Sequence, residues 1–241
     1  MKPKQILITN DDGIQDQGLE VLVEIMSTYG QVYVVAPATN MSATSHGMTL
    51  NRPLKAQNLK LPYVELAISL DGTPADCVKY ATTFLNLKPN LVISGINNEA
   101  NVGTDILYSG TVSAAIEANL LGYPAMAVST AAADYESVKD YLPTILKKWF
   151  GQSLDPKYTL NLNFPVDRQP KGIEITTVGI STYEHVYTEE NGGHRLSGVF
   201  IDLEQPEETD VKTLLRGYIS LSPLKVQLED KEKMAELKKW F

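Results

Sequence analysis

The stretch QILITNDDG, residues 5–13, ends a short apolar run with two adjacent aspartates and a glycine. Residues 18–29 then carry apolar side chains at helical spacing, and the strand-like run QVYVVAP begins at Gln31. Strand, helix and strand in this order are typical of a parallel sheet with right-handed crossovers. The sequence therefore predicts an α/β fold: a Rossmann-like, mostly parallel sheet flanked by helices, followed by a strand-rich C-terminal extension and a terminal helix.

Asp11 and Asp12 lie where the first strand is expected to end, at the sheet edge where α/β proteins bind ligands. Neighbouring side chains on a strand point to opposite faces, so the two carboxylates can meet only after the chain leaves the strand, and Gly13 permits such a turn. A hairpin turn is the alternative, but a helical pattern follows instead of a second strand. Converging carboxylates need either a raised pKa on one of them or a hard divalent cation between them, and we expect the cation.

Two further loops place oxygen-bearing side chains at the same edge of the sheet. The polar stretch after the second strand contains Ser42, and Asn97 follows the apolar run of residues 91–93. Carboxylate, hydroxyl and amide oxygens are suitable ligands for Mg²⁺ or Mn²⁺. A loop side chain that bonds its own backbone explains each residue taken singly, so it is the convergence of three loops that favours a metal site.

The stretch YSGTVSAAIEANLLG, residues 108–122, predicts a helix that begins near Thr111 and stops at Gly122. Ser109 and Gly110 precede it, where unpaired backbone N–H groups and the helix dipole attract anions. Ordinary N-capping explains the same residues without a ligand. Alone the motif is a weak indication of phosphate binding, because no Walker sequence accompanies it.

Composition narrows the class of protein. The 241 residues include 21 basic and 29 acidic side chains, a formal charge of −8, which does not provide the basic field of proteins that bind nucleic-acid duplexes or anionic membranes. Cys77 is the only cysteine, so neither a disulfide framework nor a multi-thiolate zinc site is expected. We find no apolar run long enough for a signal peptide or a membrane span, and we expect a cytoplasmic protein.

The motifs resemble those of a known family. The chain reads ILITNDDGI at residues 6–14, DGTPADCV at 71–78, LVISGIN at 91–97, LYSGTVSAA at 107–115 and GYISLSPL at 217–224. In this order they resemble the SurE family, the stationary-phase survival proteins, over nearly the whole chain. The resemblance implies a metal-dependent phosphomonoesterase that hydrolyses nucleoside 5′-monophosphates to nucleoside and phosphate. Nucleoside 3′-monophosphates are a second candidate class of substrate.

The resemblance also implies roles for particular residues. One divalent ion per subunit, Mg²⁺ or Mn²⁺, would be held by four of them: Asp11, Asp12, Ser42 and Asn97. The chemistry of such a site makes either Asp11 or Asp12 a candidate to orient or deprotonate the attacking water, without assigning the base to one of them, and no side-chain nucleophile is needed. The phosphate would contact Asn101, Ser109, Gly110 and Thr111. The chain departs from the family at three positions where the family usually has Asp, Arg and Gly: Ala38, Thr39 and Ala43.

The second part of the chain is expected to complete and assemble the molecule. We expect residues 1–165 to form the metal- and phosphate-binding core, and residues 166–241 a strand-rich extension with the final core elements and an oligomerising helix, in one continuous unit. Residues 191–193 predict a hairpin tip. The terminal helix has Met234, Leu237 and Phe241 near one face, and it should pack on its own domain or, as the resemblance implies, on a neighbouring subunit of a homodimer or homotetramer.

The sequence leaves alternatives for the roles of the three histidines and for the functional class of the protein. His46, in the Ser42 loop, is a candidate to act on the leaving oxygen, although a solvated loop histidine is the simpler explanation. His185 and His194 are expected to have structural or subunit-contact roles. A signalling receiver would need a phospho-accepting aspartate where this chain has SGIN. A nucleotide sensor that binds phosphate without hydrolysis is the alternative to an enzyme.

Overall fold

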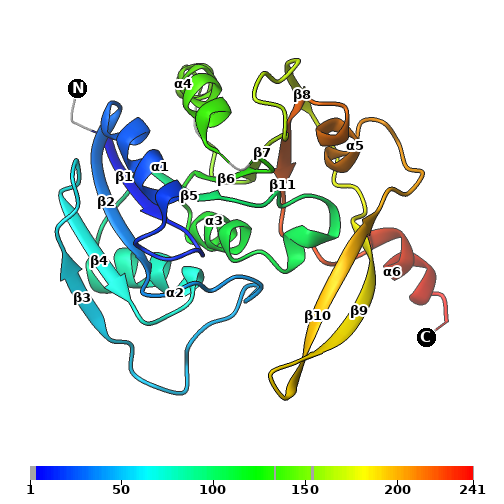
Figure 1. Ribbon diagram of the computed structural model, residues 1–241, viewed down its shortest axis with the longest axis horizontal. Coiled ribbons are helices and arrows are strands. Elements are labelled where there is room, and N and C mark those ends of the chain that lie inside the picture. Colours follow the sequence, from blue (N-terminus) through cyan, green and yellow to red (C-terminus); the bar gives the residue numbers. More distant parts are fainter. Residues whose placement is uncertain (1–3, 133, 153–154, 241) are drawn as a thin grey trace.

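A nine-stranded sheet forms the centre of the molecule in the computed structural model, which describes residues 4–132, 134–152 and 155–240 (Figure 1). The strand order is β3-β4-β2-β1-β5-β6-β7-β11-β8. The strands, in chain order, are β1 (Lys4–Thr9), β2 (Gly30–Pro37), β3 (Ala56–Leu59), β4 (Leu66–Leu70), β5 (Leu91–Asn97), β6 (Ala125–Thr130), β7 (Thr159–Phe164), β8 (Ile173–Ile175) and β11 (Ile219–Leu224).

Most of the sheet is parallel, as the sequence predicts. Parallel pairings join β4, β2, β1, β5, β6 and β7 in succession, and β11 is parallel to β8. Within this sheet, only the pairs β3–β4 and β11–β7 are antiparallel among the described strands. The predicted fold class, α/β with a mostly parallel sheet flanked by helices, is confirmed. Because β2 and β5 flank β1 on either side, the carboxyl ends of these strands meet at one edge, the position where such sheets bind ligands.

Helices cover both faces of the sheet. Helices α1 (Gln17–Ser27) and α4 (Glu136–Phe150) pack on one face, while α2 (Pro74–Lys79) and α3 (Gly110–Leu120) pack on the other (Figure 1). The short helices η1 (Tyr80–Phe84) and η2 (Gly103–Leu107) follow α2 and precede α3. No helix among the described residues combines the length and hydropathy that crossing a bilayer requires.

Helix α1 illustrates how the local sequence determines these elements. Asp16 caps its amino end, because its Oδ1 accepts a hydrogen bond from the backbone N–H of Gly18 at 2.7 Å. Leu19, Leu22 and Met26 recur at helical spacing and are fully buried against the sheet. Burying one such side chain contributes about 1.5–3 kcal/mol. The apolar face therefore fixes α1 on the sheet directly after the turn that carries the two aspartates.

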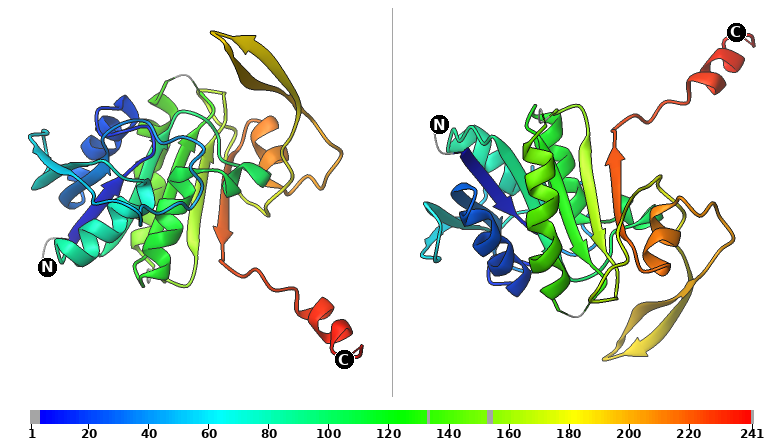
Figure 2. Two further views of the ribbon diagram at one scale, coloured as in Figure 1. Left: turned by 90° about the horizontal axis from the view of Figure 1, so that it is seen from below. Right: turned by 90° about the horizontal axis from the view of Figure 1, so that it is seen from above.

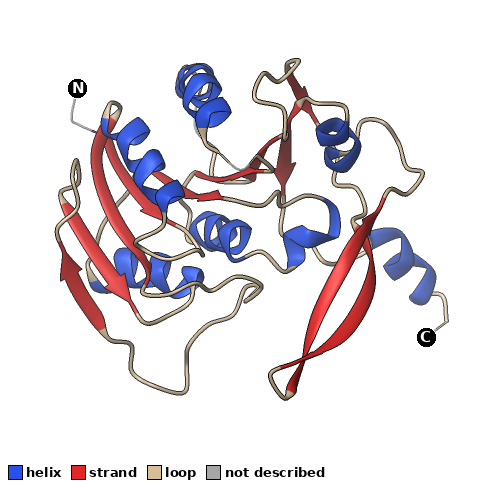
Figure 3. Ribbon diagram, viewed as in Figure 1, coloured by secondary structure: helices blue, strands red, loops and turns tan. Residues whose placement is uncertain are grey.

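The C-terminal part both completes the sheet and extends from it. Strands β9 (Thr182–Glu190) and β10 (Gly193–Ile201) form a separate antiparallel hairpin, visible in Figure 3, and its tip lies at the predicted residues. Helix α5 (Asp210–Leu215) precedes β11, and α6 (Lys231–Leu237) follows it. Figure 2 shows α6 held away from the sheet on an extended segment, and none of its residues is buried. The expectation that this helix packs on its own domain is therefore wrong for its described residues, and Phe241 lies outside them.

Candidate metal and phosphate site

Asn10 fixes the turn that follows β1. Its Nδ2 donates to the carbonyl oxygen of Gly13 at 2.9 Å, and its Oδ1 accepts from the N–H of the same residue at 3.3 Å. Gly13 has a φ of +106°, a conformation that favours glycine, as predicted. The chain continues into α1, so the hairpin alternative is wrong. Asp11 and Asp12 both lie beyond the end of β1 and line the same cavity.

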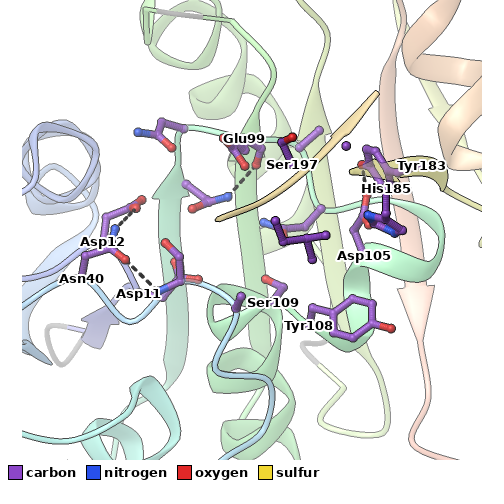
Figure 4. Close-up of a pocket in the computed structure, with 18 residues that line it drawn as sticks. Asp11, Asp12, Asn40, Glu99, Asp105, Tyr108, Ser109, Tyr183, His185 and Ser197 are labelled. Carbon is purple, nitrogen blue, oxygen red and sulfur yellow. Dashed lines mark hydrogen bonds between the residues drawn. The ribbon is translucent and has the colours of Figure 1, made fainter. Parts of the chain in front are cut away.

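The cavity lies beyond the carboxyl ends of β1, β2 and β5 and reaches the β9–β10 hairpin. Its volume of about 590 Å³ is in the range of sites for small molecules. Figure 4 shows Asp11, Asp12 and Asn40 at one end and Tyr183 and His185 at the other. The lining residues are Asp11, Asp12, Asn40, Ser42, Ala43, Asn97, Asn98, Glu99, Ala100, Asn101, Asp105, Tyr108, Ser109, Tyr183, His185, Leu196, Ser197 and Gly198.

Asp11 is held by the amino end of α3. It is 3% exposed, and the hydroxyl of Thr111 donates a hydrogen bond to its Oδ1. Burial raises the pKa of Asp11, and hydrogen bonds from the side chain and backbone of Thr111 and the backbone of Gly110 oppose that rise. Of the three residues that the sequence assigns to the phosphate here, Ser109 lines the cavity, whereas Gly110 and Thr111 face Asp11.

Asp12 has an unsatisfied oxygen. Its Oδ1 accepts from Nδ2 of Asn40 at 3.2 Å, but its Oδ2 is buried with no hydrogen-bond partner in the described structure. Burial, together with the negative charge of Asp11, raises the pKa of Asp12 to about 7. A buried carboxylate oxygen with no donor is costly unless a proton or a cation neutralises it.

The oxygen atoms at this end of the cavity suit a hard divalent cation. Ser42 and Asn97 line the cavity together with the two aspartates, so the structure brings all four predicted ligands to one cavity. The Nδ2 of Asn97 donates to the carbonyl oxygen of Glu99 at 2.6 Å, which leaves its Oδ1 available as a ligand. Over the described residues no three His, Cys, Asp or Glu side chains gather into a metal-binding group. Two carboxylates with neutral oxygens fit Mg²⁺ or Mn²⁺.

Backbone hydrogen bonds tie the loop that carries Ser42 to the other parts of the site. The N–H of Met41 donates to the carbonyl oxygen of Asp11 at 2.6 Å. The N–H of Ser45 donates to the carbonyl oxygen of Tyr108 at 3.0 Å. The loop after β2 is thus joined both to the aspartate turn and to the segment that leads into α3.

Of the three histidines, only His185 lines the cavity. His46 does not line the cavity; its Nε2 lies 2.8 Å from Oε2 of Glu117, and Nζ of Lys79 lies 2.5 Å from Oε1. The hydrogen bond from His46, followed by Lys79, lowers the pKa of Glu117. The structure therefore gives no support to His46 as an acid for the leaving oxygen. His185, expected to be structural, lines the cavity, whereas His194 does not.

Replacement of Glu117 should destabilise the fold, because its nearly buried carboxylate joins α3 to both α2 and the Ser42 loop. We expect Glu117→Ala to lower the free energy of unfolding by about 1–3 kcal/mol in urea denaturation. Glu136→Ala, which removes the exposed pairs with Lys139 and Arg168, serves as the control and should have no measurable effect. Equal denaturation midpoints for the Glu117 variant and the unaltered chain would contradict this structural role.

The far end of the cavity is formed by residues that no local sequence pattern assigns to it. Tyr183, His185, Leu196, Ser197 and Gly198 come from the hairpin, which a local pattern predicts but does not place. They reach the cavity because tertiary contacts hold the hairpin base, including the bond from the Tyr183 hydroxyl to Oδ2 of Asp105 at 2.6 Å. Asp105 and Tyr108 also line the cavity. Their position just before the predicted helix is the sequence signal that points to them.

Comparison with known proteins identifies the family of this chain and agrees with its fold. The family model described as "Survival protein SurE" matches residues 6–185. The chain belongs to the SurE family. The resemblance inferred from the motifs is confirmed, and membership of the SurE family excludes the signalling receiver.

Relatives of this SurE chain match it over almost its full length. A protein of Pelotomaculum thermopropionicum named 5′-nucleotidase SurE is 41% identical over 98% of this chain and 94% of its own length. A Campylobacter jejuni protein of the same name is 39% identical over 99% of this chain and 98% of its own length. The crystal structure of the SurE protein from Aquifex aeolicus superposes with a TM-score of 0.83, at 33% identity, and covers 98% of this chain and 99% of that one.

Proposed function

We propose that this chain is a 5′-nucleotidase, a divalent-metal-dependent phosphomonoesterase that converts nucleoside 5′-monophosphates, and nucleoside 3′-monophosphates as further substrates, to nucleoside and phosphate. The observation that carries the proposal is the meeting of the buried Asp11 and the partly buried Asp12 with neutral oxygen side chains at one end of the cavity. The names of relatives that match nearly the whole chain support the same activity. They do not favour the non-catalytic sensor.

Asp11, Asp12, Ser42 and Asn97 would hold one Mg²⁺ or Mn²⁺ per subunit. When bound, such an ion supplies positive charge that makes water more acidic and stabilises charge on phosphoryl oxygens. Thr111 keeps the Asp11 carboxylate oriented, and the unpartnered Oδ2 of Asp12 is free to act as a ligand. Either aspartate can orient the attacking water and accept its proton.

Ser109 and Asn101 are proposed to contact the phosphate. Both line the cavity beside the aspartates. The Oγ of Ser109 caps α3 by accepting from the N–H of Val112 at 3.0 Å, which leaves the hydroxyl hydrogen free to donate to a phosphoryl oxygen. The positive end of the α3 dipole adds favourable potential for the charge that develops there. Gly110 and Thr111 would contribute through this helix end and through Asp11.

The far end of the cavity is proposed to hold the nucleoside. Tyr108 directly precedes Ser109, is 61% exposed as a residue, and lines the cavity. An exposed aromatic ring next to a phosphate site is a suitable surface for a stacked base. The hairpin lies opposite with His185 and Ser197, which can form hydrogen bonds with a sugar or a base (Figure 4).

Tyr108→Ala is expected to discriminate between substrates. We expect kcat/KM for a nucleoside monophosphate to fall by roughly 5- to 100-fold, mainly through KM, because base stacking contributes about 1–3 kcal/mol. Glycerol phosphate, which has no ring, should be hydrolysed at an unchanged rate. Tyr63→Ala, an exposed tyrosine away from this cavity, is the matched control. An equal loss on both substrates would show that Tyr108 does not bind the base.

The enzyme and the sensor are distinguished by phosphate release. Protein stripped with a chelator should release no phosphate from a panel of nucleoside monophosphates, and addition of Mg²⁺ or Mn²⁺ should restore release. Nucleotide binding with no turnover under any metal would favour the sensor. Turnover that persists in the chelator would overturn the metal-dependent mechanism.

We also propose a homodimer or homotetramer in the cytoplasm. Met234 and Leu237 of α6 and Trp240 just beyond it are exposed apolar side chains that a second copy can cover. The free thiol of Cys77 is buried and suits a reducing compartment. Light scattering of the purified full chain distinguishes these assemblies from a monomer.

A further inference from the structure

Two asparagines occupy positions in β7 where apolar residues are expected. Asn161 and Asn163 are both 0% exposed and, two residues apart on a strand, lie on the same face. Strand β7 runs between β6 and β11 inside the sheet, where buried strands usually read as continuous apolar runs. Burying an amide is costly unless it forms hydrogen bonds, so these side chains require an explanation.

The amides of both residues bind the backbone of Asn101. The Oδ1 of Asn163 accepts from the N–H of Asn101 at 2.8 Å, and its Nδ2 donates to the carbonyl oxygen at 3.2 Å. The Nδ2 of Asn161 donates to the same carbonyl oxygen at 2.8 Å. The side chain of Asn101 is also fixed, because its Nδ2 donates to Oγ of Ser129 at 2.8 Å.

The two residues that follow Asn101 are held in the same way. The hydroxyl of Ser181 donates to the carbonyl oxygen of Val102 at 2.8 Å. The N–H of Gly103 donates to Oδ2 of Asp210 at 3.0 Å, and Asp210 is fully buried. Side chains distant in sequence thus fix three consecutive residues, the last two of the loop before η2 and the first of η2.

We propose that Asn161 and Asn163 are positioning residues that hold Asn101 in place for phosphoryl transfer, an inference that rests on the proposed function. Asn101 lines the cavity together with Asp11 and Ser109, so a shift of its backbone would displace groups beside the phosphate. Leucine should also cost stability for each buried backbone group of Asn101 that it leaves unpaired, so the catalytic effect is measured on variants shown to be folded.

The test compares three substitutions in β7. Asn163→Leu removes two of the three bonds to the Asn101 backbone, and we expect kcat to fall by about 100-fold with little change in KM. Asn161→Leu removes the third of these bonds and should lower kcat by about tenfold. This variant should fold normally, because the Oδ1 of Asn161 has no partner in the described structure and the Asn101 carbonyl oxygen keeps the bond from Asn163. Thr159→Val is the matched control, since this buried hydroxyl also has no partner there, and its kcat should be unchanged.

Hydrogen exchange tests the same arrangement without catalysis. We expect the amide of Asn101 to exchange about tenfold faster in Asn163→Leu than in the unaltered chain, and at the normal rate in Thr159→Val. If the unaltered chain hydrolyses no nucleotide, the proposed function fails while exchange still tests the contacts. Unchanged kcat in both folded asparagine variants, or equal losses in all three, would overturn the positioning role. The positioning role would be supported if the loss of kcat and the acceleration of exchange are both largest in Asn163→Leu, smaller in Asn161→Leu and absent in Thr159→Val.

Discussion

Asp12→Asn should abolish metal-dependent phosphate release, with kcat/KM falling by about 10³-fold or more. The substitution removes one of two carboxylates at the proposed metal site, and the charge stabilisation that such an ion provides is several kcal/mol, or roughly a factor of ten for each 1.4 kcal/mol. Steady-state assays with Mn²⁺ measure the loss. Asp140→Asn, an exposed carboxylate on α4, is the control and should retain full activity.

The same variant should fold at least as well as the unaltered chain when both are free of metal. The pKa of Asp12 is raised to about 7, so the folded state binds a proton more tightly than the unfolded state does. Stability of the metal-free unaltered chain should therefore fall as the pH rises from about 4 to about 7, and the variant should lack the part of this loss that comes from Asp12. Thermal melts at pH 5 and pH 8 measure the difference. A variant that is unfolded, or that remains active with metal, would contradict the assigned role.

Gly110→Ala should also impair the site, through a clash instead of a lost charge. A Cβ at this position would lie 2.7 Å from the Cβ of Asp11 and 3.1 Å from Cγ of Pro74. Either the aspartate or the amino end of α3 must shift, and a displacement near 1 Å in a catalytic site can cost about 100-fold in kcat. The accompanying loss of stability should be about 1–3 kcal/mol.

A glycine in open surroundings provides the control for this variant. In Gly193→Ala the nearest atom to the new Cβ is the Glu190 carbonyl oxygen at 3.8 Å, so activity and stability should stay unchanged. Activity within twofold of the unaltered chain for Gly110→Ala would show that close contact between α3 and Asp11 is unnecessary.

The sequence predicts the sheet and the near end of the cavity because their signals are local. The apolar run before Asp11 and the helical spacing after Gly13 define consecutive elements, and consecutive parallel strands place their carboxyl ends together. Ser42 and Asn97 agree with that rule, since Ser42 comes soon after β2 and Asn97 is the last residue of β5.

The remaining features depend on contacts between distant segments. The β9–β10 hairpin is recognisable, yet only bonds such as that between Tyr183 and Asp105 bring it to the cavity. Position in sequence suggested that Gly110 and Thr111 face the phosphate, whereas in the structure they face Asp11. Their proposed contact with substrate stays a prediction. The asparagines of β7 had no local signal, because a buried amide is explained only by the loop that it binds.

The central claim is that Asp11 and Asp12 share one divalent cation at the edge of the parallel sheet. The most direct test is a crystal structure of the protein with Mn²⁺, using anomalous difference density to locate the ion. We expect a single peak per subunit at about 2.0–2.4 Å from carboxylate oxygens of both aspartates, with Asn97 or Ser42 in the same coordination shell. A peak elsewhere, or none at a Mn²⁺ concentration that supports hydrolysis, would contradict the account.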